Sequence, residues 1–573
     1  MICLIKGERL RTPFAGYIRQ MLTAEGVWEW REEEGASPSL GGAAVLFATY
    51  LPRQQMSEVV DFVKAGGILV ALRPQRDLAR LLGLRPTGRV LRNGYFLLPD
   101  HPLIPSYLGE TTLQVPSSFD LYEKGNSDVL AWWRDPLEGD QTYPAIFVSE
   151  HGNGKVVIFS YDPADAVVKL HQGIGSQASG QPEEDPDGMG WYKPNDLFVS
   201  QLDTRLRLIP QADVHQRLLV HLLEKIVLET GRPFLRLWSF PNAVPSLGLL
   251  TGDSDSMKRE HFDQVLRIIE DYGGCYTIYL MEQDWKLIGV QEAEELRKRG
   301  NGVAHHTWVG FNPSVSEMRQ GVRRQIEGFR DRFGFQPLSH RGHCCIWVGW
   351  VDQAKILAEN GILLDGNHYS YVHHQYGFLS GSGKPFQFCD ETGQPINLWE
   401  QTTLMSDDCM LQDKTHLTPF TIDQAVQRSR ELIDALTDKW HGVYHACFHP
   451  VYMRTDWDYP YTAPWIEAVA SYLKEKKVPM VSAEYWADFI FKRQRVRLKS
   501  IYDGNGRWTY RIVAEDDLRG LTVLLPDSVQ SVDRDGKRVP VSSVVLEGEQ
   551  RKVIIIDLKA GQAIRLTLYH ADS

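Results

Sequence analysis

One short stretch near the middle of the chain constrains its fold most. Residues 247–250 form an apolar run of strand length, and two carboxylates, Asp253 and Asp255, follow it among small residues. In parallel α/β folds the loops that follow the strands carry the chemistry. The pattern therefore predicts a buried strand that delivers two acids to the edge of a sheet. Residues two apart in a strand share a face, so both acids should point into one mouth; the alternative is a turn that caps the next helix.

Length, composition and charge limit the classes of protein to consider. With 573 residues, the chain is expected to hold roughly two to four domains. Hydrophobic residues make up 43% of it, which is typical of a globular protein. The net charge of −11, without a dense basic run, argues against nucleic acid or a membrane surface as a partner. No signal peptide or membrane-spanning run is recognised, so a cytoplasmic location is expected.

The first part of the chain, residues 1–235, alternates strand and helix patterns. Residues 43–48 and 68–72 predict strands, and the apolar spacing in 56–63 predicts an amphipathic helix between them. This β-α-β order predicts a parallel, flavodoxin-like sheet, and the segment resembles glutamine-amidotransferase-like domains. Amidotransferase chemistry needs a cysteine nucleophile, but the only cysteine here is Cys3, inside a predicted strand. We therefore expect a non-catalytic α/β domain with a role in binding or assembly.

The remaining sequence contains two further parts. A polar, Pro- and Gly-rich stretch at 177–195 predicts a long surface loop that could border a neighbouring site. Residues 236–495 then repeat strand and helix patterns, which predicts a parallel (β/α) barrel whose loops carry function. Residues 496–573 contain strand patterns with turn residues at 503–506, which predicts a small β-sandwich. The expected fold class is thus an α/β multidomain protein.

Five motifs stand at predicted strand ends of the barrel segment. They are, in chain order, Thr251-Gly252-Asp253-Ser254-Asp255, His305-His306-Thr307-Trp308, His340-Arg341-Gly342-His343, Leu364-Asp365-Gly366-Asn367 and Cys447-Phe448-His449-Pro450. With this ordered set and a predicted strand at 478–482, residues 245–490 resemble the polysaccharide deacetylase (NodB-homology) family. The resemblance implies a deformed parallel barrel and a divalent metal, usually zinc. Amide hydrolysis suits such a metal, which lowers the pKa of a bound water to roughly 7.

The resemblance also implies roles for individual residues. Asp253 matches the family's general base, Asp255 its metal-binding carboxylate, and Arg341 the arginine that holds the base ionised. His449 matches the general acid that protonates the leaving amine, and Asp365 a position that lines the substrate groove. A guanidinium lowers the pKa of a nearby carboxylate, and a positioned acid serves a departing nitrogen. An exchange of roles between the first two acids stays open.

One position departs from the family pattern. His306 matches the first histidine of the family's His-Thr-x-x-His motif, but Gly310 stands where the second belongs. His343, two residues after Arg341, is a candidate for the missing metal ligand. His305 is a poorer candidate, because adjacent strand residues face opposite ways. The third protein ligand is therefore open among the two histidines, a water, or no metal at all.

The expected function is metal-dependent hydrolysis of non-peptide carbon–nitrogen bonds, most directly N-deacetylation of an amino-sugar polymer or oligosaccharide. A small amide substrate fits the same residues. The rival from another class is a catalytically inactive, deacetylase-like protein that binds glycan, and Gly310 is its main support. A third hypothesis keeps the barrel active and has the N-terminal domain select substrate or join subunits. A homo-oligomer through the N-terminal or C-terminal domain is compatible with each of these.

Overall fold

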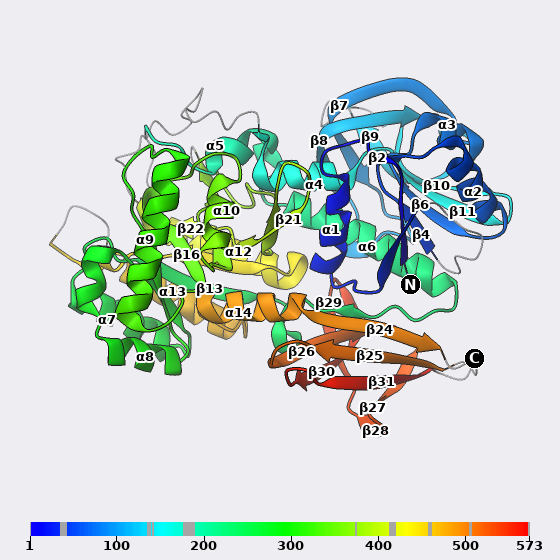
Figure 1. Cartoon of the computed structure of the whole chain (residues 1–573). Coiled ribbons are helices and arrows are strands. Elements are labelled where there is room, and N and C mark those ends of the chain that lie inside the picture. Colours follow the sequence, from blue (N-terminus) through cyan, green and yellow to red (C-terminus); the bar gives the residue numbers. More distant parts are fainter. Residues whose placement is uncertain are drawn as a thin grey trace.

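The computed structural model is a mixed α/β structure in which three groups of strands can be distinguished (Figure 1). It describes residues 2–34, 43–134, 139, 143–175, 190–372, 375–411, 420–456, 461–502 and 507–570. The predicted turn at 503–506 and residues 177–189 of the predicted loop lie outside the described residues. Figure 1 shows the C-terminal strands below the N-terminal ones, with the central strands beside them. Among the described helices, none is both long and apolar enough to cross a bilayer.

The N-terminal sheet joins a parallel half to an antiparallel half. Its order is β3-β1-β4-β6-β11-β10-β9-β7-β8, with parallel pairs from β3 to β11 and antiparallel pairs from there on. Counted along the chain, the parallel strands lie in the order 2-1-3-4-5, which flavodoxin-like sheets share. The bounds are β1 (Ile2–Lys6), β3 (Trp30–Glu34), β4 (Ala43–Leu46), β6 (Ile68–Leu72), β7 (Pro86–Leu98), β8 (Thr111–Tyr122), β9 (Asp128–Arg134), β10 (Pro144–His151) and β11 (Gly154–Phe159). The β-α-β pattern predicts the parallel half but not the antiparallel extension.

Helix α2 (Arg53–Lys64) shows how the sequence pattern produces the parallel half. Val59 and Val63 are buried on the face that packs on the sheet, one helical turn apart. Gly66 follows with a φ of 105°, a backbone conformation that ends the helix and that glycine adopts without strain. Cys3 lies in β1, and burial raises the pKa of its thiol. A thiol in this state lacks the low pKa of a cysteine nucleophile.

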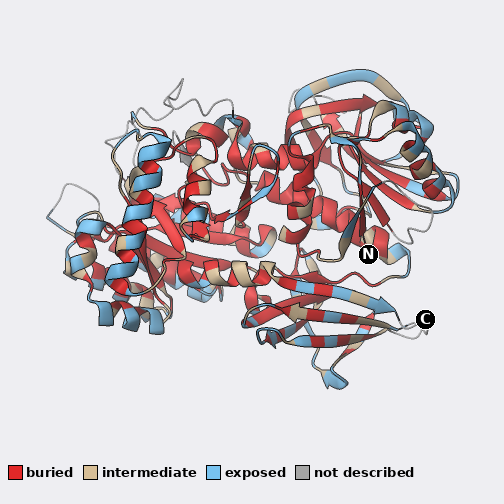
Figure 2. Ribbon diagram, viewed as in Figure 1, coloured by how far each residue is buried: buried red, intermediate tan, exposed pale blue. Residues whose placement is uncertain are grey.

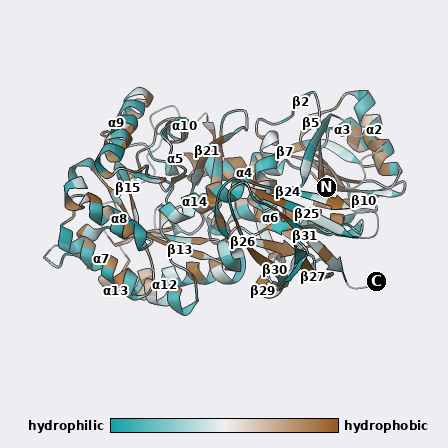
Figure 3. Ribbon diagram, turned by 60° about the horizontal axis from the view of Figure 1, so that its bottom comes forward, coloured by the Kyte–Doolittle hydropathy of each residue, from teal (hydrophilic) through white to brown (hydrophobic). Residues whose placement is uncertain are grey.

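The remaining helices differ in how far they are buried. They are α1 (Ile18–Ala24), α3 (Arg76–Leu81), α4 (Pro163–Gln172), α5 (Asn195–Phe198), α6 (Gln211–Glu229), α7 (Arg259–Asp271), α8 (Val290–Lys298), α9 (Val315–Phe333), α10 (Asp352–Glu359), α11 (Asp407–Leu411), α12 (Ile422–Asp434), α13 (Ala463–Glu475) and α14 (Ala483–Gln494). Helices α7, α8 and α9 expose one face (Figure 2), and that face is hydrophilic (Figure 3). Almost every residue of α6 is buried, because this helix runs through the middle of the molecule.

The central sheet is parallel over most of its width and curls into an open half-barrel. Its order is β20-β21-β17-β16-β15-β14-β13-β23-β22, and only β20 pairs in the antiparallel sense. The bounds are β13 (Leu247–Asp253), β14 (Tyr276–Leu280), β15 (Gly302–Thr307), β16 (Ser339–Gly342), β17 (Leu364–Asp365), β20 (Phe386–Cys389), β21 (Pro395–Glu400), β22 (Met405–Ser406) and β23 (Val443–Cys447). The strand predicted at 478–482 is reduced to a single bridge between Met480 and Gly248. Pro479 explains this, because it has no N–H to extend the ladder.

A glycine lets the neighbouring strands close around the end of β13. A Cβ on Gly252 would collide with the backbone oxygen of Phe448 and the hydroxyl of Tyr276. These two groups meet each other there, since the tyrosine hydroxyl donates to the Phe448 carbonyl at 2.7 Å. Only glycine permits so close an approach. Because Gly252 has no side chain, Tyr276 of β14 and Phe448, just after β23, can lie next to Asp253 at the predicted site.

The C-terminal strands form two antiparallel sheets with a common core. Their orders are β24-β25-β31-β27-β28 and β12-β26-β30-β29. The bounds are β12 (Arg236–Leu237), β24 (Val496–Tyr502), β25 (Trp508–Ala514), β26 (Leu518–Leu525), β27 (Val529–Arg534), β28 (Lys537–Val539), β29 (Ser542–Leu546), β30 (Glu549–Leu558) and β31 (Ala563–His570). One hydrophobic cluster contains Ile512 and Val523 from the two sheets together with Trp486 of α14. The sheets are therefore packed on the central part of the chain.

A cluster of buried charges ties the C-terminal sheets to the N-terminal part. Arg236 donates from both terminal nitrogens to the carboxylate of Glu547, each at 2.9 Å. It also donates to the backbone oxygen of Glu25 at 3.1 Å, and Arg551 donates to Glu224 of α6 at 3.0 Å. Every one of these side chains is almost completely shielded from solvent. Removing one partner from such a group leaves an uncompensated buried charge.

Glu547→Gln is expected to lower the free energy of unfolding by about 3–5 kcal/mol, because Arg236 loses its bidentate partner in the interior. Urea unfolding followed by circular dichroism measures the change. Glu327→Gln is the matched control, since it removes an exposed pair with Arg323 and should have little effect. Equal losses in the two variants would contradict a stabilising role for the cluster.

Candidate metal and catalytic site

The carboxyl ends of the central strands gather the predicted site residues at one edge of the sheet. Asp253 ends β13, and His306 of β15 pairs in register with Arg341 of β16. Strand β23 lies beside β13 in parallel, and His449 follows it by two residues. Parallel strands end at the same edge, so these side chains meet although they are far apart in sequence.

Asp255, His306 and His343 each bring one ligand atom to a common point. Oδ1 of Asp255 lies 3.3 Å from Nε2 of His306 and 3.0 Å from Nδ1 of His343, and the two nitrogens are 3.3 Å apart. Zinc bonds to oxygen and nitrogen measure about 2.0–2.1 Å, so two ligands of a tetrahedral zinc lie about 3.3 Å apart. The three atoms have the spacing of one face of such a tetrahedron, and they fit a divalent metal.

The orientation of His306 suits the same purpose. Its Nδ1 donates to the backbone oxygen of Arg341 at 2.8 Å, so the neutral ring has its lone pair on Nε2. His306 is fully buried, whereas the side chains of Asp255 and His343 are 24% and 25% exposed. Within the trio, His306 is therefore shielded by protein, whereas Asp255 and His343 are accessible from a pocket.

Asp255 reaches the trio through a turn and not along a regular strand, so the expected shared strand face is wrong. Strand β13 ends at Asp253, and Asp255 and Ser256 follow with left-handed φ angles of 39° and 61°. Asp284 holds this turn by accepting the N–H of Ser256 at 3.0 Å. The two acids still face one mouth, because an oxygen of each lies 3.6 or 3.7 Å from Nε2 of His449.

His343 is the histidine that lies beside Asp255 and His306. It stands on the short turn after β16, where its ring meets the edge of Trp308 with centroids 4.8 Å apart. Gly310 lies in the loop after β15 with a φ of 98° and has no atom within 4 Å of the Cβ position. His305 points to the other side of its strand and donates to Gln325 at 3.1 Å. Strand alternation thus places His305 as predicted.

Arg341 holds Asp253, the first acid of the motif. One terminal nitrogen donates to Oδ1 of Asp253 at 3.1 Å, and both side chains are buried. Burial by itself raises the pKa of Asp253, but the charges of His306, Arg341 and His449 outweigh it and hold this pKa well below its usual range. The Asp253 carboxylate therefore stays ionised. Its other oxygen, Oδ2, lies 3.6 Å from Nε2 of His449.

His449 has a partner that the sequence motifs did not reveal. Its Nδ1 donates to Oδ1 of Asp407 at 2.5 Å, and its backbone N–H donates to the other oxygen at 2.8 Å. Burial would lower the pKa of His449, but Cys447, Asp407 and Asp408 raise it well above its ordinary value. The signal in the sequence is weak: two acids directly after a two-residue strand, β22. Asp407 fixes the ring so that Nε2 faces the pocket.

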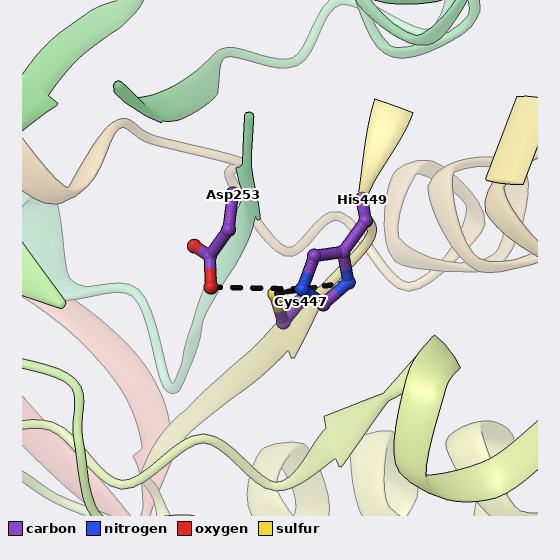
Figure 4. A group of neighbouring side chains, drawn as sticks. All are labelled: Asp253, Cys447 and His449. Carbon is purple, nitrogen blue, oxygen red and sulfur yellow. Dashed lines mark hydrogen bonds and ion pairs between the residues drawn. The ribbon is translucent and has the colours of Figure 1, made fainter. Parts of the chain in front are cut away.

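One pocket of about 140 Å³ is lined by Asp253, Asp255, Arg341, His343, Cys447 and His449, whereas His306 and Asp407 are not among its lining residues. Figure 4 shows three of the lining residues, Asp253 at the end of one strand and Cys447 and His449 at the end of the next. Asp365, predicted to line the groove, is not among the lining residues. It sits opposite His340 in the strand register and accepts a hydrogen bond from that ring at 2.8 Å, so the pair is buried within the sheet.

Aromatic side chains form the rim of the pocket. Trp191, from the described end of the predicted 177–195 loop, donates to the backbone oxygen of Cys344 at 3.0 Å and lines the pocket. Its ring lies 5.0 Å from that of Phe311, which lies 4.9 Å from that of Trp308. Phe311 is 56% exposed. Trp191 and Trp308 are half-buried, and a cluster of partly exposed aromatic side chains beside a polar pocket is typical of a ligand-binding groove.

No protein-family model and no curated protein matches the chain. Among solved structures it is similar to the carbohydrate deacetylase Agd3, with 10% identity over 99% of this chain and 98% of the other and a TM-score of 0.42. A protein from Mycobacterium smegmatis described as a polysaccharide deacetylase matches 44% of this chain and 93% of its own, at 17% identity and a TM-score of 0.35. A mutant of a CE4-family pseudoenzyme with restored activity matches 43% and 69%, at 12% identity and a TM-score of 0.26.

His343→Ala is expected to weaken zinc or cobalt binding by more than the roughly 10–100-fold that losing an outer-shell partner costs, because it removes one of three converging candidate ligand atoms. Competition with a chromogenic chelator measures the affinity. His101→Ala is the control, since His101 pairs with Asp128 away from the pocket. Unchanged affinity in His343→Ala would remove this residue from the ligand set.

Proposed function

We propose that this protein is a metal-dependent hydrolase that removes N-acetyl groups from an amino-sugar polymer or oligosaccharide. The observation that carries the proposal is the convergence of three parts in one pocket. These parts are the ligand trio, the Arg341–Asp253 pair and the Asp407–His449 pair. Their separate roles in amide hydrolysis are metal binding, proton acceptance and proton donation.

Asp255, His306 and His343 would hold the metal. When bound, a divalent cation supplies Lewis acidity toward an acyl oxygen and lowers the pKa of a water. The unequal exposure of the ligands supports this use, because an open side is needed for water and substrate. Gly310 does not argue against a metal once His343 is counted among the ligands.

Asp253 would act as the general base. Arg341 occupies one of its oxygens and keeps it ionised, and the other oxygen remains on the pocket side. An ionised carboxylate accepts one proton from the water that attacks the acetyl carbon. Because the guanidinium is itself fixed by further hydrogen bonds to Thr251 and Thr403, at 3.1 and 2.9 Å, the base has a defined direction.

His449 would act as the general acid. Its raised pKa favours the protonated ring, and Asp407 directs Nε2 toward the pocket. Nε2 donates a proton to the leaving nitrogen as the carbon–nitrogen bond breaks, so the products are acetate and a free amine. The proton taken up by Asp253 balances the one given by His449.

The rim supports a sugar as the substrate. Trp191, Trp308 and Phe311 present ring faces and edges beside polar groups, a combination suited to a ring that is apolar on one face and hydroxylated at its edge. Trp191 precedes the central sheet by many residues, so the proposed N-terminal domain, residues 1–235, would take part in substrate selection. A central domain of 236–495, a β-sandwich of 496–573 and a homo-oligomer through either flanking domain remain parts of the proposal.

Asp253→Asn is expected to reduce acetate release from N-acetylated chito-oligosaccharides or peptidoglycan fragments by about 10²–10⁴-fold, since the amide cannot accept the proton. Metal content should stay at the wild-type level, because Asp253 lies outside the trio. Full activity in the variant would refute its role as base. No acetate release from the metal-loaded wild type would instead support the rival function, an inactive glycan-binding protein.

Trp191→Ala is expected to raise KM for an oligosaccharide by about tenfold with a smaller change in kcat, because a stacking contact of roughly 1.4 kcal/mol is lost. Steady-state kinetics on a series of oligosaccharide lengths measures both constants. Tyr485→Ala is the control, an exposed aromatic on α14 that does not line the pocket. A rise in KM common to both variants would not be attributable to the rim.

A further inference from the structure

An open groove lies beside the pocket, across its aromatic rim. It has a volume of about 660 Å³ and runs between residues 308–313, which follow β15, and the N-terminal half of α9 (Figure 1). Trp308 and Phe311 line the groove. The ring centroid of Trp308 lies 4.8 Å from that of His343, and the centroid of Phe311 lies 5.0 Å from that of Trp191. His343 and Trp191 line the pocket, so the groove adjoins the pocket across these rings.

The shape of the groove is set by contacts between the loop and the helix. Gln325 of α9 donates to the backbone oxygen of Trp308 at 2.7 Å and accepts the N–H of that residue at 3.2 Å. Gly321 allows this approach, because a Cβ there would lie 2.6 Å from the side chain of Val309. Gly310 also lines the groove and has no atom within 4 Å of its Cβ position. The residue that replaces the expected histidine therefore adds no side chain to fill this space.

Glu317 is the only acid among the described residues that line the groove. Its Oε2 accepts the backbone N–H and the hydroxyl of Ser314 at 2.8 and 2.7 Å, while Oε1 has no partner in the described part of the chain. The hydrogen bonds from Ser314 lower the pKa of Glu317. Its carboxylate therefore stays ionised and keeps one oxygen for a ligand.

The only basic residue among the same described lining residues, Arg324, is already paired. Its two terminal nitrogens lie 3.0 and 2.9 Å from the two oxygens of Glu282, which is not a lining residue of the groove. The charge of Arg324 is thus compensated from outside the groove. The charge of Glu317 is not compensated, so the groove favours a cationic ligand over a neutral one of the same shape.

We propose that this groove binds a second sugar unit of the glycan chain and that Glu317 favours a unit with a free amine. The inference rests on the proposed function and names its substrate more closely. The rings of Trp308 and Phe311 offer apolar surface to the sugar ring. An amine is protonated at neutral pH and can pair with the carboxylate, whereas an N-acetyl group is neutral. The preferred substrate is then a partly deacetylated chain, with an acetylated unit in the pocket beside a free amine in the groove.

Titration calorimetry on the full-length protein in the presence of zinc tests the groove, with a glucosamine trisaccharide and its fully N-acetylated counterpart as probes. We expect the amine form to bind about two- to fivefold more tightly, the range of an exposed ion pair. Glu317→Gln should remove this preference without disturbing α9, because glutamine also serves in a capping box. Glu327→Gln, on the same helix but paired with Arg323 outside the groove, is the matched control and should keep the preference.

Salt provides a measurement that needs no variant. The preference of the unmodified protein should disappear near 1 M salt, where the Debye length falls to about 3 Å. Equal affinities for the two sugars at low salt, no binding of either, an unchanged preference in Glu317→Gln, its loss in Glu327→Gln, or its persistence at high salt would each overturn the proposal. None of these readouts depends on hydrolysis. A preference that depends on Glu317 without acetate release would support the groove and reject the proposed function.

Discussion

The buried guanidinium of Arg341 is the interaction around which the pocket is arranged. It donates to Asp253, Cys447 and Thr251, and also to Thr403 and to Nε2 of His445, both at 2.9 Å. These partners come from β13, β23 and the segment between β21 and β22, so one side chain connects three parts of the sheet edge. A buried cation is tolerated only where its donors are satisfied and its charge is compensated, and here both conditions hold. The floor of the pocket is therefore cross-linked by hydrogen bonds to this guanidinium.

The histidines near this guanidinium differ in their hydrogen-bond partners. His445 accepts from Arg341 and donates from Nδ1 to a backbone oxygen, and burial lowers its pKa to about 3, so it remains neutral. His449 faces acids instead, and its pKa is raised. His306 donates to a backbone oxygen; burial lowers its pKa, but Asp253 and Asp255 outweigh burial and raise it. The charge of each of these three histidines is thus set by the groups around its ring.

Residues outside the central sheet also line the pocket. Trp191 comes from the chain before that sheet and is held by the backbone of Cys344. Glu547 lies near the end of the chain and is held by Arg236, directly before the sheet begins. Buried polar contacts of this kind are sensitive to small displacements, because each lost partner leaves an unsatisfied group. Trp191 thus connects the chain before the central sheet with the pocket, and Arg236 connects Glu547 of the C-terminal part with Glu25.

The local features of this protein follow from periodicity in the sequence. The stripe of Val59 and Val63 predicts α2, and the alternation of a strand separates His305 from His306, because backbone geometry sets both repeats. The position of Asp253 at a strand end and its neighbourhood with Arg341 and His449 were also predictable, once the parallel order of the strands was recognised.

Other features depend on contacts that no local pattern encodes. Asp255 reaches His306 through left-handed residues held by Asp284, and His343 reaches it because its turn follows the strand beside His306. Asp407 meets His449 across 42 residues of chain, and Asp365 is drawn away from the pocket by His340. The sequence by itself specified which chemical groups stand at the strand ends. Register, turn conformation and competing hydrogen bonds, which exist only in the folded chain, settled which of those groups face one another.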